Sequence, residues 1–277
     1  MFKQYKDVLG NLGQYSKDVF KHGYVKMLFA HMKTWSKTSW MLIIANFIIQ
    51  VLLAWQGFGT TSLAQTILGF LGANLSVMCV VGISNKAPIQ GWFGATSAIC
   101  IIASALLAHN FADATIQLGY LIFLDVFCIL SPEWNNNVKV HKMGDYKQLK
   151  AYIEWVKYLS FFAIVWLISY YAYKNGINDP RPFLDSGTFS IGVTGALMEF
   201  NLLREQYIIW TLSSVLTIGL WVQTAMQGDA NYALVASYSI FLLNDLWAFF
   251  SAKGWFRGDA IKEANETSAL TSSPTNK

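Results

Sequence analysis

The chain alternates between long apolar stretches and short polar segments. Each apolar stretch runs for roughly 18–22 residues, the length that a helix needs to cross the ~30 Å hydrocarbon layer of a membrane. Too many such stretches occur in 277 residues for all of them to be buried helices of a soluble core. The pattern therefore predicts an all-α membrane protein with about eight transmembrane helices. We place them at residues 40–56, 62–83, 92–109, 115–132, 152–174, 187–203, 207–226 and 232–251.

Composition supports the same class. Charged residues make up only 13% of the chain, about half the share of a soluble globular protein. The formal net charge of +4 is small, and no nucleic-acid partner is expected. Cys79, Cys100 and Cys128 all lie inside apolar stretches with no metal-binding or redox spacing, so we interpret them as small buried hydrophobic residues.

The distribution of lysine and arginine predicts the orientation. If the N-terminus is cytoplasmic, the outer loops carry only Lys174 and Arg181, which leaves 18 of the 20 basic residues on the inside. Cytoplasmic loops are enriched in basic residues in this way. A seven- or nine-helix arrangement would scatter the bias, so both termini are expected in the cytoplasm.

The two ends of the chain differ from its centre. Residues 1–38 interleave apolar positions with lysines, which predicts a cytoplasmic amphipathic helix lying on the bilayer surface. A helix that binds a protein partner is the alternative. Residues 39–61 hold an extra first transmembrane helix and its loop. Residues 256–277 are rich in Glu, Asn, Thr and Ser, and we expect a disordered cytoplasmic tail.

Two pairs of short motifs indicate an internal repeat. Gly-Phe-Leu-Gly-Ala begins at Gly69 and Gly-Val-Thr-Gly-Ala at Gly192, 123 residues later. Tyr-Leu-Ile-Phe-Leu begins at Tyr120 and Tyr-Ser-Ile-Phe-Leu at Tyr238, 118 residues later. Chance similarity between helices rich in small and apolar residues is the alternative.

The repeat predicts a leading helix followed by a 3+1+3 arrangement. Residues 62–132 form the first three-helix repeat and residues 187–255 the second. Residues 133–186 supply a cytoplasmic loop, one linker transmembrane helix and an outer loop. Because a single helix separates the repeats, both enter the membrane from the same side, as parallel repeats do in some transporters.

Four glycines in the repeat motifs have a structural interpretation. Small residues one turn apart allow transmembrane helices to approach closely. The alternative is a hinge that moves during a functional cycle. These residues are Gly69, Gly72, Gly192 and Gly195.

Four stretches of the chain carry a family resemblance. They are Leu-Gly-Ala-Asn-Leu-Ser-Val-Met-Cys-Val-Val from Leu71 with Trp-Phe-Gly from Trp92; the fourth helix through Trp134; Asp185 before the sixth helix with Arg-Glu-Gln-Tyr-Ile-Ile-Trp from Arg204; and the eighth helix with Lys-Gly-Trp at 253–255. Through these stretches, roughly residues 62–255 resemble the PnuC family of vitamin transporters.

The resemblance implies a SWEET-like fold, a homotrimer and a place in the bacterial cytoplasmic (inner) membrane. It further implies facilitated diffusion of nicotinamide riboside with trapping by cytoplasmic phosphorylation, and no cofactor, metal or catalytic residue. The chain departs from the family where the ligand is expected. Tyr207 replaces the first Trp of a Trp-x-x-Trp motif, and Gly195 and Ala196 stand where a Gln or an aromatic residue is expected. Thiamine, riboflavin or a deoxynucleoside is therefore the alternative substrate.

A nucleoside site needs aromatic faces and neutral hydrogen-bonding groups. Tyr207, Trp210, Ser214 and Trp221 share one face of the seventh predicted helix, because their spacings of three, four and seven match helical periodicity. Packing against the sixth helix is the alternative. On the third helix, Trp92 and Ser97 hold comparable positions.

Three polar residues lie deep in apolar helices. Asn244 and Asp245 belong to the eighth predicted helix. Asp125 in the fourth helix is equivalent to Asp245 if the Tyr-x-Ile-Phe-Leu match is extended with a two-residue slip. An unpaired polar side chain in hydrocarbon costs several kcal/mol, so these side chains should face the protein interior. The carboxylates would favour a cationic ring, and an interhelical contact is the alternative. Glu199 and Asn201 are weaker candidates.

The main rival class is a membrane-embedded enzyme. The chain contains no Gly-x-Ser-x-Gly nucleophile elbow. It also has no pair of histidines four residues apart in a predicted span, since its histidines stand at 22, 31, 109 and 141. We therefore expect a transporter rather than an enzyme, with a non-transporting scaffold or receptor as a further alternative.

Overall fold

The computed structural model describes residues 2–56, 62–136, 138–144, 149–179, 181–226, 232–251 and 254–256. Within these ranges the regular elements are all helices, so the predicted all-α class is confirmed. The long helices are α4 (Lys37–Gln56), α5 (Leu63–Ser84), α6 (Gln90–Leu107), α7 (Phe111–Tyr120), α10 (Leu149–Gly176), α11 (Pro182–Phe200), α12 (Gln206–Met226) and α13 (Tyr232–Phe250). A π-helical turn, η1 (Leu121–Asp125), and α8 (Val126–Leu130) continue α7.

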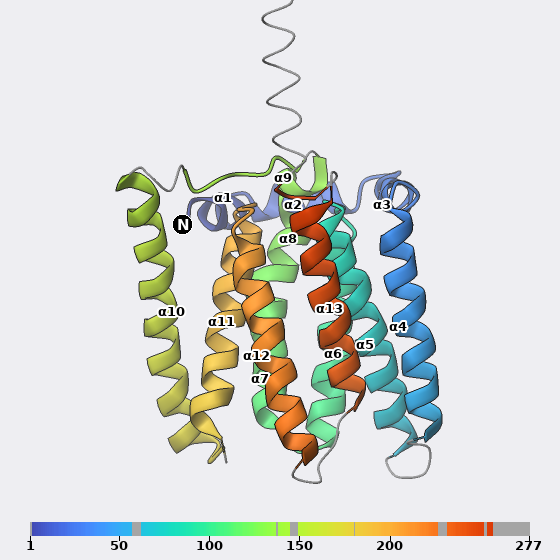
Figure 1. The fold of residues 1–277 in the computed structure, drawn as a ribbon. Helices are drawn as coiled ribbons and strands as arrows, with labels where there is room; N and C mark the ends of the chain where they lie inside the picture. Colours follow the sequence, from blue (N-terminus) through green and yellow to red (C-terminus); the bar gives the residue numbers. More distant parts are fainter. Residues whose placement is uncertain are drawn as a thin grey trace, which may run out of the picture.

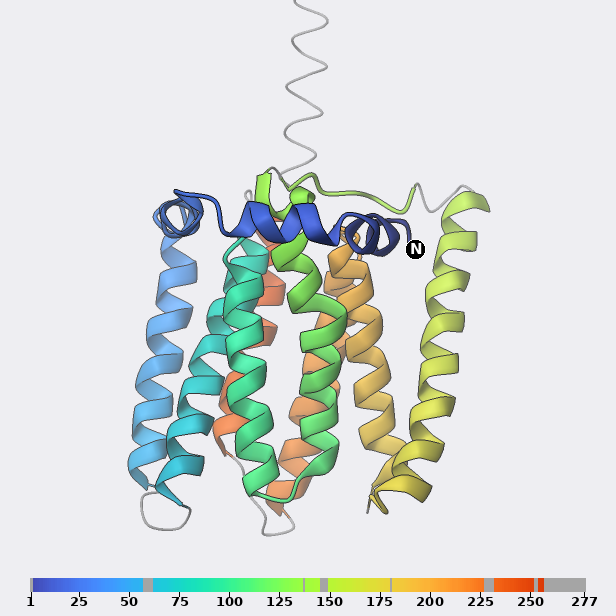
Figure 2. The same cartoon turned by 180° about the vertical axis from the view of Figure 1, so that it is seen from behind.

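The long helices stand side by side in one bundle, with α4 and α10 at its two edges (Figures 1 and 2). The short helices α1 (Lys3–Gly10), α2 (Leu12–Val19) and α3 (Tyr24–Met32) lie across one end, together with α9 (Pro132–Asn136). We call this the inner end, after the orientation predicted from the basic residues; α4 begins there and α13 ends there. The opposite, outer end carries the turn from α6 to α7 at Ala108–Asn110.

The N-terminal arm is not the single amphipathic helix that its pattern predicts. It divides into α1, α2 and α3 because Asn11 interrupts the first helical stretch and Gly23 adopts φ 91°, a left-handed conformation that glycine tolerates. Tyr5 and Val8 are buried against the bundle, whereas Phe20 is 83% exposed. The arm therefore packs some of its apolar side chains on the bundle and leaves others exposed.

Five described helical segments are long and apolar enough to cross a membrane: α4, α5, α6, Asp113–Leu130 and Ala151–Gly176. The helices α11, α12 and α13 run alongside them in the bundle, and the total of eight spans stays a prediction. Large apolar side chains on α4 and α10 are exposed, as expected of faces that meet lipid.

The helix α11 is buried along most of its length. Every residue from Ser190 to Phe200 is buried, and the helix contacts α7, α10 and α12. Its many small residues explain this burial, since they allow neighbouring helices to approach closely. The burial of α11 keeps its polar side chains in the interior of the protein.

Candidate functional site

A cavity of about 830 Å³ lies inside the bundle. Its lining includes Gln56, Asn110 and Arg181 near the outer end and reaches Asp125 and Tyr207 deep in the protein. Helices of both predicted repeats contribute, together with α4. The volume falls in the range of small-molecule binding sites, roughly 300–1,000 Å³.

The charges in this cavity are strongly unequal. Among the described lining residues a single cationic side chain, Arg181, is accompanied by five carboxyl groups. These belong to Asp113, Asp125, Asp185, Glu199 and Asp245. Burying an ionised group is costly unless a partner compensates it, so the cavity is suited to a solute that brings positive charge.

Asp125 sits at the deep end because two structural features place it there. It ends the π-helical turn η1, and such turns often occur at functional sites. Its carboxyl group fits against Gly94 of α6, where a Cβ atom would collide with Asp125 Oδ1 and lie 3.0 Å from Cys79 Sγ. Glycine at position 94 is therefore required for the close approach of the Asp125 side chain.

Asp245 reaches the same cavity from α13. Its Oδ2 accepts a hydrogen bond of 3.2 Å from Ser214 Oγ on α12. Both side chains are buried and both line the cavity. Asp125 and Asp245 thus face one interior space from the two predicted repeats.

Trp210 and Glu199 form an aromatic and polar wall. The Trp210 indole lies against Gly195 and meets the Tyr120 ring edge-on, with centroids 6.1 Å apart. The indole N–H approaches Glu199 without hydrogen-bond geometry, and both Glu199 oxygens and Trp210 Nε1 are buried without a hydrogen-bond partner among the described residues. Unpaired buried polar groups are rare in folded proteins, and here they adjoin a cavity that a polar ligand could fill.

The predicted glycines lie at helix contacts. A Cβ at Gly72 would lie 2.5 Å from Ile101 Cγ1, and one at Gly192 would lie 2.8 Å from Tyr120 Cε1. At Gly69 a Cβ would have only an ordinary contact, 3.7 Å from Ser104 Oγ. Gly192 therefore allows a ring from the first predicted repeat to pack closely on the second.

Other predicted residues divide into two groups. Tyr207 and Ser97 line the cavity, and Ser97 Oγ donates to the carbonyl oxygen of Gly72 at 2.8 Å. Asn244 does not belong to the lining: it accepts from Ser84 Oγ at 2.8 Å and donates to the Val80 carbonyl at 3.3 Å, which ties α13 to α5.

Trp92 also lies outside the cavity lining. It is 37% exposed, and its Nε1 donates to Tyr24 Oη at 3.3 Å, which joins α6 to the N-terminal arm. The side chain of Trp221 lies outside the described residues. Asn201 donates to the Leu197 carbonyl of its own helix.

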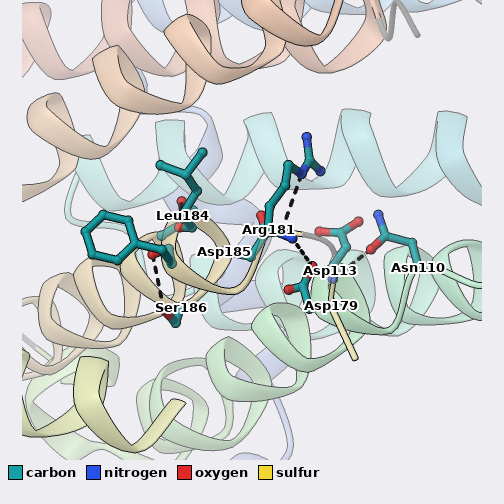
Figure 3. A network of polar contacts seen from close by, with 9 residues as sticks. Asn110, Asp113, Asp179, Arg181, Leu184, Asp185 and Ser186 are labelled. Atoms are coloured by element: carbon teal, nitrogen blue, oxygen red, sulfur yellow. Dashed lines mark hydrogen bonds and ion pairs between the residues drawn. The ribbon is translucent and has the colours of Figure 1, made fainter. Parts of the chain in front are cut away.

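The outer mouth carries a charged network that the sequence reading overlooked. Arg181 Nε lies 3.7 Å from Asp185 Oδ2, and the Arg181 backbone N–H donates to Asp179 Oδ1 at 3.0 Å. Asn110 Oδ1 accepts from the Asp113 backbone N–H and caps α7. Figure 3 shows these groups where the start of α7 meets the segment leading into α11. The sequence signal that could have predicted this network is the presence of ionisable residues, such as Asp113 and Asp185, at the ends of the apolar stretches.

Among the described residues, no group of three His, Cys, Asp or Glu side chains is arranged to hold a metal ion. The interior of the cavity is acidic and aromatic, and its polar groups are suited to binding an organic solute.

Comparisons with known proteins agree with this arrangement. The family described as nicotinamide mononucleotide transporter matches residues 66–257. The nicotinamide riboside transporter PnuC of Neisseria mucosa (strain ATCC 25996 / DSM 4631 / NCTC 10774 / M26) is 20% identical over 190 residues, which cover 66% of this chain and 71% of that protein. A crystal structure of the vitamin B3 transporter PnuC superposes with a TM-score of 0.65 at 15% identity, covering 88% of this chain and 99% of that chain. At this identity the superposition shows a shared fold.

Proposed function

Because the chain belongs to the nicotinamide mononucleotide transporter family, we propose that it carries nicotinamide riboside across the bacterial cytoplasmic membrane by facilitated diffusion. The observation that carries this proposal is the interior cavity, in which aromatic rings and carboxyl groups lie together. Nicotinamide riboside matches both features, since it joins a cationic pyridinium ring to a ribose rich in hydroxyl groups.

The charges of the lining favour the riboside over its phosphorylated form. A phosphate group adds about −1.5 to −2 charges at neutral pH. The described lining offers this group only Arg181, which already pairs with Asp185, against five carboxyl groups. The unphosphorylated nucleoside is therefore the preferred solute.

We assign the contacts of nicotinamide riboside by matching each of its chemical groups to side chains of the cavity lining. The nicotinamide ring stacks on Trp210 near Tyr120, and its positive charge faces Asp125 and Asp245. The ribose hydroxyl groups bond to Ser214 and to other neutral groups of the wall, with Ser97 on the opposite side. Stacking on an aromatic ring and neutralisation by carboxylates are both stronger in a cavity that excludes water.

The same charges explain one-way uptake without a pump. After entry, phosphorylation in the cytoplasm converts the solute into an anion. The acidic cavity binds this anion poorly, so the phosphorylated solute is not carried back out. Net inward flux then needs neither ATP nor an ion gradient at the transporter. The proposal places both termini in the cytoplasm and the chain in a homotrimer, and assigns no enzymatic step to it.

Calorimetry on purified protein tests the substrate. The panel contains nicotinamide riboside, nicotinamide mononucleotide, thiamine, riboflavin and a deoxynucleoside. We expect micromolar binding of the riboside and at least tenfold weaker binding of the mononucleotide, the effect of about 1.4 kcal/mol. Tighter binding of thiamine, whose thiazolium ring is also cationic, would reassign the substrate within the same cavity.

Liposomes test the mechanism. Protein reconstituted without ATP or an ion gradient should equilibrate labelled nicotinamide riboside across the membrane, and vesicles loaded with a riboside kinase and ATP should accumulate label. Absence of binding to every member of the panel, together with absence of flux, would refute the transporter assignment.

A further inference from the structure

An aromatic cluster closes the cavity at its inner end. We call it the inner plug and define it by five buried side chains from different parts of the chain: Tyr5, Trp134, Phe200, Tyr207 and Trp255. Tyr207 is the member of the plug that lines the cavity, and its ring packs on Trp255 with centroids 5.6 Å apart. A solute leaving toward the inner end has to pass these rings, so the plug must open during transport.

One member of the plug, Tyr5, comes from the N-terminal arm and lies outside the residues that match the family. It is only 8% exposed. Its ring packs on Phe127 of α8 and Phe200 of α11, with centroid distances of 4.6 and 4.3 Å. Tyr5 thus bridges the first predicted repeat and the second.

The hydroxyl group of Tyr5 makes a more specific contact. It donates a hydrogen bond of 2.5 Å to the carbonyl oxygen of Phe123. Phe123 belongs to the π-helical turn η1, which ends at Asp125. A hydrogen bond to the backbone of this irregular turn restrains the segment that carries a carboxyl group of the cavity.

The donor stays protonated in this environment. Burial, followed by the nearby Cys128 and Glu199, raises the pKa of the Tyr5 phenol well above its ordinary value. The hydroxyl group therefore remains a donor throughout the physiological pH range.

Within the arm, the helix α1 is held on the bundle by few side chains. In α1 only Tyr5 and Val8 are buried, while Leu9 and the two lysines of the helix, Lys3 and Lys6, are exposed. An element with one buried stripe can detach at modest cost and rest on the membrane surface.

We propose that Tyr5 is a positioning residue for transport and that α1 is a latch: it joins η1 to Phe200 and holds the inner end of the cavity closed. Release of Tyr5 frees both segments and opens the inner plug. The inference rests on the proposed transport role of the cavity and is independent of which solute is carried.

Tyr5→Phe tests the latch, because it removes the hydroxyl group and keeps the ring. The reporter is Cys79, which is buried and lines the cavity. A membrane-impermeant sulfonated maleimide is applied to inverted and to right-side-out membrane vesicles, and peptide mass spectrometry separates Cys79 from Cys100 and Cys128. Loss of one hydrogen bond should raise the labelling rate of Cys79 from the inner side about fivefold, with little change from the outer side.

Tyr15→Phe is the matched control. Tyr15 lies on the same arm, and its hydroxyl donates to Asp7 Oδ2 at 3.0 Å within the arm. It should leave the labelling ratio unchanged. Thermal unfolding of each variant identifies a fold defect, and Tyr5→Ala provides a second variant that also removes the ring contacts.

A ratio equal to wild type in both Tyr5→Phe and Tyr5→Ala, in protein that unfolds normally, would overturn the latch. A lower unfolding temperature with an unchanged ratio would also overturn it, since that result describes packing alone. Because labelling needs no solute, the latch and the riboside assignment can fail independently.

Discussion

The indole ring of Trp210 lies against the backbone of Gly195, so closely that a Cβ atom at position 195 would come within 3.1 Å of the ring. The two residues belong to α12 and α11, and the absence of a side chain on one determines the position of the other. This pair sets the depth of the aromatic wall of the cavity, on which the proposed stacking of the solute depends.

Gly195→Ala should therefore displace Trp210 by a few tenths of an ångström and weaken binding of nicotinamide riboside several-fold, with the protein still folded. Overpacking of this kind costs about 1–3 kcal/mol. Calorimetry measures the affinity. Gly219→Ala is the control, because a Cβ there has no neighbour within 4 Å. Equal affinities in the two variants would contradict a role for this wall.

Trp210→Ala removes the proposed stacking surface itself. We expect a loss of about 1–3 kcal/mol of binding free energy, or roughly one to two orders of magnitude in Kd. Trp55→Ala, at an exposed position on α4, controls for general effects of removing tryptophan. Unchanged affinity in Trp210→Ala would reassign this ring to helix packing.

Asp125→Asn tests whether a carboxylate selects a cationic ring. The amide keeps the shape of the side chain and removes its charge, so affinity for nicotinamide riboside should fall about tenfold, near 1.4 kcal/mol. Binding of an uncharged deoxynucleoside, measured in parallel, should not weaken. Asp18→Asn on the exposed arm is the control. If both ligands lose affinity equally, the effect is structural.

Gly94→Ala should perturb the same carboxyl group from the other side. A Cβ at Gly94 collides with Asp125 Oδ1, so the side chain must move and binding should weaken at least as much as in Asp125→Asn. Gly69→Ala adds a Cβ with only an ordinary contact to Ser104 Oγ at 3.7 Å, and binding should be retained. Retained affinity in Gly94→Ala would show that the position of Asp125 is unimportant.

Asn244→Ala is expected to reduce stability and spare binding. The change removes the two hydrogen bonds that join α13 to Ser84 and Val80 of α5, and such interhelical bonds contribute roughly 1 kcal/mol. The thermal unfolding midpoint in detergent should fall. Ser239→Ala, whose hydroxyl bonds only within α13, is the control. If Asn244→Ala keeps a normal unfolding midpoint and loses binding, Asn244 contacts the ligand and the structural interpretation is wrong.

Helix positions and family were predictable because both follow from local sequence. The length of an apolar run is set by the thickness of the bilayer, and the helices observed in the described ranges begin and end within a few residues of the predicted runs. The resemblance to the PnuC family, drawn from short motifs, is confirmed by the match over residues 66–257 and by the shared fold. The π-helical turn was not predicted, because no local sequence signal for it was recognised. The division of the N-terminal arm was missed although its causes, Asn11 and Gly23, are local.

The candidate site was predictable only in part. A polar residue in an apolar helix is expected to face the protein, and Asp125, Asn244 and Asp245, to which this rule was applied, are all buried. The rule does not say which interior surface each residue meets. Glu199 is only a weak candidate from the sequence because it stands near a helix end, yet the packing of α11 buries it in the cavity wall.

Asn244 and Asp245 show the difference between what the sequence determines and what only the tertiary structure decides. Their sequence establishes that both are polar groups deep in a membrane helix and that neither can be left facing lipid. Consecutive residues point about 100° apart around a helix, so one of them meets α5 and the other meets the cavity. Only the packing of α13 against its neighbours decides which is which, because rotation of a helix about its axis is set by contacts between segments far apart in the chain.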